Sequence, residues 1–252
     1  YPTSDLKDNN GTLWFGFNDG SVFYSLNDQL KPLSIQNART VCTILSGPDN
    51  FIYIIPQGGN IYKVNPLKPD EISIYPLDKE INVFSACFTI AGDLLLGTQE
   101  DIKVCSLTSD ALSIKSTVDG FNYSNVLAIH RINNKDDYLV GTDGRGLYKL
   151  TLAPGGNVVK YFENHQELEN LSVQSIFSDQ EKNFWISTNN AGIILLRISE
   201  NCESVESVHF INKRTGLTGD NIKLVYQDNE GNYWIGFSGD GLSLLNSLSL
   251  SF

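Results

Sequence analysis

The stretch "DNEGNYWIGFSGDGLSLL", which begins at Asp228, recurs along the chain, and this repetition restricts the fold more than any other feature. Copies begin at Asp8 ("DNNGTLWFGFNDGSVFYSL") and at Asp179 ("DQEKNFWISTNNAGIILL"), and each places a Trp six residues after its Asp. Three weaker copies lie between them. The six anchors of the repeat are Trp14, Tyr53, Leu95, Leu139, Trp185 and Trp234. They are 39 to 49 residues apart, which is the period of a propeller blade, about 40 to 50 residues.

Each repeat contains four short runs in which apolar and polar residues alternate. A first run such as "NIKLVY" precedes the anchor run, and "GLYKL" and "VVKYF" are examples of the third and fourth. Alternation bounded by Gly, Asn, Asp and Pro is typical of strands and turns, and no stretch shows a helical apolar stripe. The sequence therefore predicts an all-β fold, a β-propeller of four-stranded antiparallel blades with six repeats visible. The alternative is a part of a seven-bladed or tandem propeller.

The predicted blades divide the chain into six consecutive ranges within a single domain or segment, residues 1–252. These ranges are 1–36, 37–80, 81–118, 119–165, 166–213 and 214–252. The first begins with a poorly formed strand, "YPTSDLK", and the last ends with an expected fourth strand, "LSLSF". The chain contains no Met, so we expect it to be a piece of a longer protein.

Trp and Asp in the repeat have structural interpretations. A Trp that recurs beside Gly in the second strand is expected to pack between neighbouring blades. Asp8, Asp179 and Asp228 fall in the turn between first and second strands, where Asp commonly hydrogen-bonds its own backbone. We therefore expect these carboxylates to form turns and not to act in catalysis.

Composition and charge restrict the partners. The chain has 252 residues, of which 41% are hydrophobic, and its apolar runs, such as "GIILL", are too short to cross a bilayer. We expect a soluble domain without direct membrane insertion. The net charge of −11 opposes the attraction to phosphates that dominates nucleic-acid binding, so nucleic acid is not an expected partner.

No set of residues predicts a cofactor or a metal. His130, His165 and His209 lie in different repeats and at different positions of the blade. The four cysteines lack the close spacing of a metal knuckle, and strand parity opposes a disulfide between Cys42 and Cys87. We interpret the cysteines as buried free thiols and expect no cofactor, no metal and no catalytic residue.

The sixth repeat, "TGLTGDNIKLVYQDNEGNYWIGFSGDGL", resembles the two-component regulator propeller repeat. The shared pattern is a GL turn, an Asn before the first strand, Asp, Gly, an apolar residue, Trp and a final GGL-like turn. The match is good in the first, fourth and fifth repeats and partial in the second and third, where Tyr53 and Leu95 replace Trp. Family propellers usually have seven blades, whereas six repeats are visible in this chain.

This resemblance implies a periplasmic location, as part of an inner-membrane-anchored sensor. Members of the family are sensor regions of hybrid two-component histidine kinases and are followed by an immunoglobulin-like domain, a membrane helix and a kinase. The expected function is that of a non-enzymatic periplasmic sensor domain that recognises a carbohydrate fragment and relays the event to a kinase. The expected partners are an oligosaccharide and the other domains of the same protein, with a homodimer as a further option.

Loops that can meet a ligand emerge on one face of a propeller. They are the loop between second and third strands and the connection between blades, and both are rich in Asn, Asp and Arg. Such side chains form directional hydrogen bonds with hydroxyl and acidic groups, although tight turns also require Asn, Asp and Gly. The candidate ligand-binding residues are Arg145, Asp143, Tyr123, Asn189, Asn190, Asp240 and Arg214. Arg145 is the strongest of them, because turn geometry alone does not require Arg between two glycines.

Two alternative functions remain open at this stage. A polysaccharide lyase or hydrolase would need converging side chains, for example Tyr123, His165 and Arg145. A structural or dimerisation scaffold would hold a sensor together without contacting the signal.

Overall fold

Nearly all regular secondary structure among the described residues is β-strand, and the strands lie in two compact units, Tyr1–Asp119 and Gly120–Phe252. A computed structural model describes residues 1–27, 29–35, 39–109, 111–153, 156–162, 165–239 and 241–245. The helices among these residues are two single turns of 3-10 helix, η1 (Gln166–Leu168) and η2 (Lys213–Thr215).

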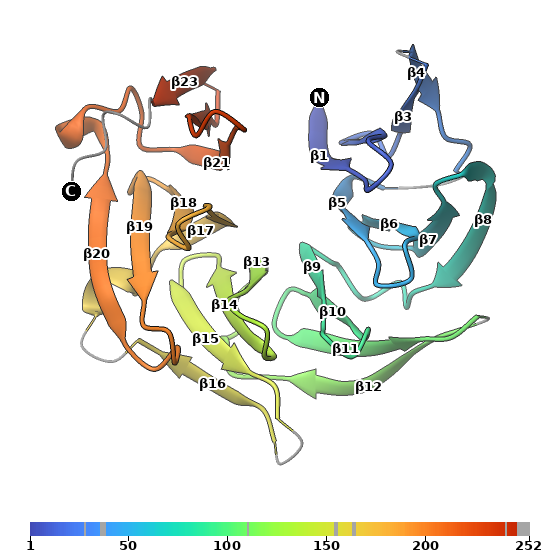
Figure 1. Cartoon of the computed structure of the whole chain (residues 1–252). Coiled ribbons are helices and arrows are strands. Elements are labelled where there is room, and N and C mark those ends of the chain that lie inside the picture. The colour runs from blue at the N-terminus through green and yellow to red at the C-terminus, as the bar shows by residue number, and fades with distance from the viewer. Residues whose placement is uncertain are drawn as a thin grey trace. The chain divides into compact units, whose positions relative to one another are not determined.

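Unit 1 contains three four-stranded antiparallel sheets, and in each sheet the strands pair in chain order (Figure 1). The strands of the first sheet are β1 (Pro2–Lys7), β2 (Leu13–Phe17), β3 (Val22–Leu26) and β4 (Gln29–Pro32). Those of the second are β5 (Val41–Ser46), β6 (Ile52–Pro56), β7 (Asn60–Asn65) and β8 (Lys68–Pro76). Those of the third are β9 (Ser85–Phe88), β10 (Leu94–Gly97), β11 (Ile102–Leu107) and β12 (Leu112–Val118).

Unit 2 repeats this arrangement. The strands of the fourth sheet are β13 (Val126–Arg131), β14 (Asp137–Thr142), β15 (Leu147–Thr151) and β16 (Val158–Tyr161). Those of the fifth are β17 (Ser172–Ser178), β18 (Phe184–Asn189), β19 (Ile193–Ile198) and β20 (Val205–Ile211). The described strands of the sixth are β21 (Ile222–Gln227), β22 (Tyr233–Phe237) and β23 (Leu242–Leu245).

Each sheet is one blade, numbered 1 to 6 along the chain, so the predicted all-β propeller fold is confirmed. All six anchors lie in the second strand of their blade, from Trp14 in β2 to Trp234 in β22. The poorly formed first strand at the N-terminus is β1, which pairs with β2. The expected fourth strand of blade 6, "LSLSF", lies outside the described residues. The division of the chain into one domain stays a prediction.

Each Trp is held by the Asp six residues before it. Nε1 of Trp14 donates a hydrogen bond to Oδ2 of Asp8 at 2.9 Å. The same bond joins Trp185 to Asp179 (2.8 Å) and Trp234 to Asp228 (2.9 Å). In all three turns the other oxygen, Oδ1, accepts the backbone N–H groups two and four residues later. The prediction that these Asp residues form turns is confirmed, and the indole bond explains why Asp and Trp recur together.

A bulge near the start of the first strand recurs in five blades. An extra residue bends a strand and redirects its neighbours. The residue before the bulge in blade 2 is Val41, which is fully buried, and its counterpart in blade 5 is Val173. A Cβ on Gly16 would lie 2.5 Å from Val41, and one on Gly141 would lie 2.3 Å from Val173. Gly therefore stands two residues after the anchor in blades 1 and 4, because the next blade approaches too closely for a side chain there.

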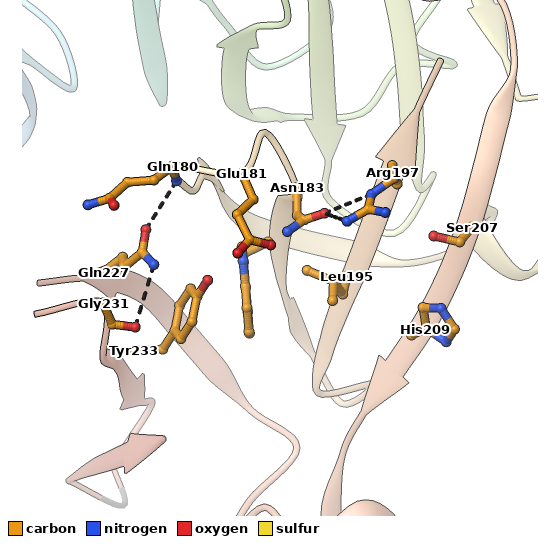
Figure 2. Close-up of a pocket in the computed structure, with 11 residues that line it drawn as sticks. Gln180, Glu181, Asn183, Leu195, Arg197, Ser207, His209, Gln227, Gly231 and Tyr233 are labelled. Atoms are coloured by element: carbon orange, nitrogen blue, oxygen red, sulfur yellow. Dashed lines mark hydrogen bonds between the residues drawn. The ribbon is translucent and has the colours of Figure 1, made fainter. Parts of the chain in front are cut away.

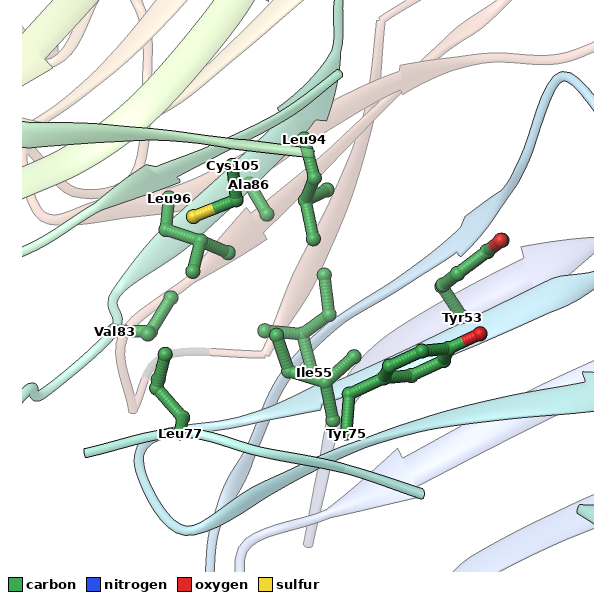
Figure 3. Close-up of a cluster of buried hydrophobic side chains, with 10 residues drawn as sticks. Tyr53, Ile55, Tyr75, Leu77, Val83, Ala86, Leu94, Leu96 and Cys105 are labelled. Atoms are coloured by element: carbon green, nitrogen blue, oxygen red, sulfur yellow. The ribbon is translucent and has the colours of Figure 1, made fainter. Parts of the chain in front are cut away.

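Consecutive blades within a unit share a hydrophobic core. Blades 2 and 3 pack Tyr53, Ile55 and Tyr75 against Leu94 and Leu96 (Figure 3). Similar clusters join blades 1 and 2, blades 4 and 5, and blades 5 and 6. The anchors Trp14, Tyr53, Leu139 and Trp185 belong to the core shared with the following blade. The strand neighbours of Tyr53 and Trp185 belong to the core shared with the preceding blade.

The expectation that every Trp packs between blades is right for two of the three. Trp14 and Trp185 are 0% and 1% exposed, and each belongs to the core that its blade shares with the next. For Trp234 it is wrong, because this side chain is 39% exposed. The reason is that the apolar side chains around it on this face of blade 6 are exposed as well. Its other apolar side chains, Leu224, Tyr226, Leu242 and Leu244, are between 42% and 70% exposed.

The four cysteines, all of which the structure describes, form no disulfide. Cys105 and Cys202 are buried as expected. Cys42 and Cys87 are only half-buried, because first strands lie closer to solvent than second and third strands.

Candidate functional site

The loops that carry the predicted ligand residues are tied to the connections between blades. In blade 4 the backbone N–H of Asp143 donates to the carbonyl of Asn125 at 3.0 Å, and Oγ of Ser172 donates to Oδ1 of Asp143 at 2.7 Å. Oγ of Ser124 donates to the carbonyl of Asp143 at 2.7 Å. These contacts place the loop between β14 and β15 beside the connections at both of its sides. We call this side of the blades the loop edge.

Arg145 lies at the tip of this loop and is exposed. Gly144 and Gly146 on either side have φ values of 80° and 82°, in the left-handed region that favours Gly. Both donate backbone N–H groups to the carbonyl of Leu171. The two glycines thus form the turn, and the Arg145 side chain forms no hydrogen bond or ion pair among the described residues.

Tyr123 lies in the connection that leads into blade 4, directly before Ser124. Its backbone is left-handed, with φ at 54°, and its side chain is 88% exposed. A strongly exposed ring beside the Asp143 loop is a surface on which an apolar face of a ligand can stack. The structure therefore places Tyr123, Asp143 and Arg145 in linked segments, although no described contact joins their side chains.

The other predicted residues belong to a second group of loops. The backbone N–H of Asn190 donates to Oδ1 of Asn221 at 3.0 Å, which links the β18–β19 loop to the connection into blade 6. Arg214 lies in that connection, inside η2, and is exposed, as are Asn189 and Asn190. Asp240 lies outside the described residues. The assignment of all these residues to a ligand site stays a prediction.

A cavity of about 290 Å³ lies at the opposite edge of unit 2, between blades 5 and 6 (Figure 2). Trp185 and Tyr233 line it, and their rings stack with centroids 4.1 Å apart and an interplanar angle of 29°. Gln227 connects the two blades at its side, because its Oε1 accepts the backbone N–H of Gln180 and its Nε2 donates to the carbonyl of Gly231.

Asp179 is the hydrogen-bonding centre of three side chains that line this cavity. Its Oδ2 accepts from Nε1 of Trp185, from Nδ2 of Asn183 and from the hydroxyl of Tyr233 at 2.8, 2.9 and 3.0 Å. The last bond comes from blade 6. Burial and the bond to Asp179 raise the pKa of Tyr233, so this hydroxyl remains a donor at every physiological pH. One carboxylate therefore closes the turn of blade 5 and also attaches blade 6.

The charged groups of the cavity are Arg197 and Glu181. Nε and Nη2 of Arg197 donate to Oδ1 of Asn183 at 3.0 and 2.8 Å, and the amide nitrogen of Asn183 is bonded to Asp179. The guanidinium is thus fixed by an amide and not by a carboxylate. Glu181 lines the cavity, and its carboxylate extends from the turn into this region (Figure 2). Neither side chain has an ion-pair partner among the described residues.

Sequence reasoning did not select this cavity. The sequence feature that points to the cavity is the Arg in the otherwise apolar third strand "IILLRI". The partner of that Arg comes from a turn, and the opposite wall of the cavity comes from the next blade. His165, which the lyase alternative required, pairs with Glu167 at 2.8 Å and lines a different cavity. Among the described residues, no group of three His, Cys, Asp or Glu side chains could hold a metal ion.

Part of the sixth blade matches a protein-family model. Residues 216–239 match the family model described as two component regulator propeller. Over these residues the chain is similar to a two-component regulator propeller repeat. The repeat covers the hairpin of β21 and β22, including the Asp228–Trp234 bond. No curated protein matched the chain.

Solved structures share the fold of these repeats. The extracellular domain of the hybrid two-component system BT3049 from B. thetaiotaomicron aligns with a TM-score of 0.64 at 18% identity, over 98% of this chain and 40% of that one. A catalytically inactive virginiamycin B lyase from Staphylococcus aureus with quinupristin gives 0.73 at 11%, over 99% and 82%. PorZ, a surface component of the type-IX secretion system of Porphyromonas gingivalis, gives 0.69 at 14%, over 97% and 38%. At these identities the likeness is one of fold alone.

The chain spans less than half of the two-component and secretion-system structures that it matches. Among the described residues, no helix has the length and apolar character that a bilayer crossing requires.

Proposed function

We propose that this chain is a non-enzymatic recognition module of a periplasmic two-component sensor, and that it binds a carbohydrate fragment at the loop edge of unit 2. The observation that carries the proposal is the two-component regulator propeller repeat at residues 216–239. The extracellular domains of two-component systems among the structural neighbours support the same location and role. Through the other domains of the parent sensor, binding is relayed to a kinase.

The chemistry of the loop edge supports a polyhydroxylated ligand. Arg145 offers a planar set of N–H donors without a described protein partner, and Asp143 and Asn190 add acceptors and donors in neighbouring loops. Tyr123 supplies an exposed ring. Directional polar groups around an aromatic surface match a sugar, which has hydroxyl groups at its rim and an apolar face.

Titration calorimetry tests this proposal. The purified protein is titrated with neutral and acidic oligosaccharides, and the same series is repeated with Arg145→Ala. We expect at least one oligosaccharide to bind and Arg145→Ala to weaken it about tenfold or more, as loss of a charged hydrogen bond does. Arg131→Ala is the matched control, because Arg131 is also exposed but lies at the other end of its strand, away from the loop edge.

A complete absence of heat across the panel contradicts recognition of a carbohydrate by this module. Equal affinities of Arg145→Ala and the parent protein contradict the assigned site. If no ligand binds while the mass rises with concentration, the scaffold alternative gains support. Turnover of a polysaccharide by the purified protein would instead favour the enzyme alternative.

A further inference from the structure

The cavity between blades 5 and 6 contains two opposite charges that do not neutralise each other. Arg197 lies on β19 and Glu181 lies in the turn between β17 and β18, and both line the same cavity. The structure shows no ion pair between them. In Figure 2 the two side chains lie on either side of Asn183.

Arg197 is held in a fixed orientation by a neutral group. Two of its five N–H donors are bonded to Oδ1 of Asn183, and that amide is itself fixed by Asp179. Asp179 already accepts five hydrogen bonds, from two backbone N–H groups and three side chains. It is therefore saturated, and the positive charge of Arg197 remains available to a ligand. Guanidinium groups of this kind bind carboxylates through two parallel hydrogen bonds.

Glu181 rules out a simple anion as the best ligand. Its carboxylate borders the same space, so it repels an anion bound to Arg197 and attracts a cation. A ligand that carries both charges satisfies both side chains. The remaining wall, which includes Leu195, Ser207 and His209, combines apolar surface with short polar groups. The volume of about 290 Å³ suits a small molecule, close to the lower limit of about 300 Å³ for ligand sites.

We infer that this cavity binds a small zwitterion, with the ligand carboxylate on Arg197 and its ammonium group on Glu181. Free amino acids and short peptides have this chemistry and differ in the separation of their charges. The site lies between blades 5 and 6, at the opposite edge of the blades from the Arg145 loop in blade 4, and does not depend on carbohydrate binding there.

A series of ω-amino acids measures which separation of the two ligand charges fits the cavity best. Glycine, 4-aminobutanoate, 5-aminopentanoate and 6-aminohexanoate are titrated into the purified protein, with pentanoate and pentylamine as analogues that carry one charge. We expect the affinity to peak at one chain length, and each single-charge analogue to bind at least about tenfold more weakly than that zwitterion. A peak at glycine indicates an α-amino acid, and a peak at a longer chain indicates the two ends of a peptide.

Two variants distinguish binding of a zwitterion from binding of a plain anion. Arg197→Gln and Glu181→Gln should each weaken the best zwitterion about tenfold or more. For a plain carboxylate, Glu181→Gln would instead improve binding, because it removes a repulsive charge. Glu230→Gln is the matched control, since Glu230 has the same place in the turn of blade 6 and does not line the cavity. Arg131→Gln is the control for loss of an exposed Arg.

Arg197→Gln also removes two hydrogen bonds to Asn183, so Arg197→Lys is measured beside it. Lys keeps the charge but loses the planar pair of donors. The affinity of Arg197→Lys for the best zwitterion should therefore lie between those of the parent protein and Arg197→Gln. The proposal is overturned if pentanoate binds as well as its zwitterion, if Glu181→Gln strengthens binding, or if no member of the series binds at up to about 10 mM. None of these results depends on Arg145, so a failure here is distinguishable from a failure of the proposed function.

Discussion

The hydroxyl of Tyr233 donates a hydrogen bond of 3.0 Å to Oδ2 of Asp179, across the boundary between blades 5 and 6. Asp179 also holds its own turn and its own Trp, so a group that organises one blade also joins it to the next. The core that the two blades share is apolar, and apolar contacts are not directional. This bond fixes the relative position of the two blades that form the Arg197 cavity.

Removal of the Tyr233 hydroxyl should weaken this boundary. We expect Tyr233→Phe to lower the free energy of unfolding by about 1–3 kcal/mol, because a buried hydrogen bond to a charged acceptor is lost while the ring stack on Trp185 remains. Urea unfolding followed by circular dichroism measures the change. Tyr226→Phe, at a ring that is 54% exposed, is the control and should change stability little. Equal effects of the two substitutions would show that the bond between blades does not stabilise the protein.

The close approach of neighbouring blades predicts different effects at two equivalent glycines. A Cβ on Gly141 would lie 2.3 Å from Val173, whereas a Cβ on Gly236 has no neighbour closer than 3.4 Å. We expect Gly141→Ala to cost about 1–3 kcal/mol or more through overpacking, and Gly236→Ala to lie within about 0.5 kcal/mol of the parent protein. Thermal unfolding of both variants checks this. Similar losses in both would mean that Gly serves the backbone of the strand and not the approach of the next blade.

His130 should make stability depend on pH in the acidic range. Burial, and to a smaller extent the charge of Arg131, lower the pKa of His130 to about 4. Between the ordinary value near 6.5 and about 4, the unfolded chain binds a proton that the folded protein does not, so the free energy of unfolding falls as the pH falls. The loss is at most about 1.4 kcal/mol per pH unit, and it stops below about pH 4, where both states are protonated.

Urea unfolding of the parent protein and His130→Gln between about pH 7 and 4 isolates this effect, since the carboxylates are common to both. Gln retains a polar end that can reach Ser178, the partner of Nε2 of His130 at 3.0 Å. The stability of the parent protein should fall more steeply with decreasing pH than that of the variant. Parallel curves would contradict a neutral, desolvated His130.

The thiol of Cys105 should be the least reactive of the four. Burial raises the pKa of Cys105 to about 12, with a further contribution from the charge of Asp93, and the side chain is 0% exposed. Only the thiolate reacts with alkylating agents. In the folded protein at about pH 8, Cys105 should therefore be the last cysteine to be alkylated. Timed labelling with iodoacetamide and mass spectrometry of the peptides measures the order. The half-buried Cys87 is the comparison, and faster labelling of Cys105 than of Cys87 would exclude this packing.

The repeat revealed the blades because strand alternation and turn residues are local signals. The repeat did not reveal which residue differences between blades compensate each other in the folded structure. In blade 2 the position of the turn Asp holds Gly47, and a Cβ there would lie 2.4 Å from the ring of Tyr53. The Tyr53 hydroxyl instead donates to Asp49 at 2.9 Å. The absence of the turn Asp and the presence of Tyr in place of Trp are thus structurally linked, and only the folded turn shows this link.

The loop edge was predictable for a similar reason, since antiparallel topology alone decides which loops share an edge. The Arg197 cavity was not, because its walls come from a turn, two strands of blade 5 and the next blade. Nor could the sequence distinguish Trp234 from Trp14. Their local patterns agree, and both donate to an Asp at 2.9 Å, but burial depends on what lies beyond the blade.

The exposure of Trp234 gives the protein an intrinsic fluorescent probe. The chain has three indoles, and two of them are sealed inside a core, so a soluble quencher such as acrylamide reaches mainly the third. Emission from Trp234 therefore reports on one face of blade 6 without any label. A shift of that emission to shorter wavelength, with protection from the quencher, would register any molecule that settles on this face.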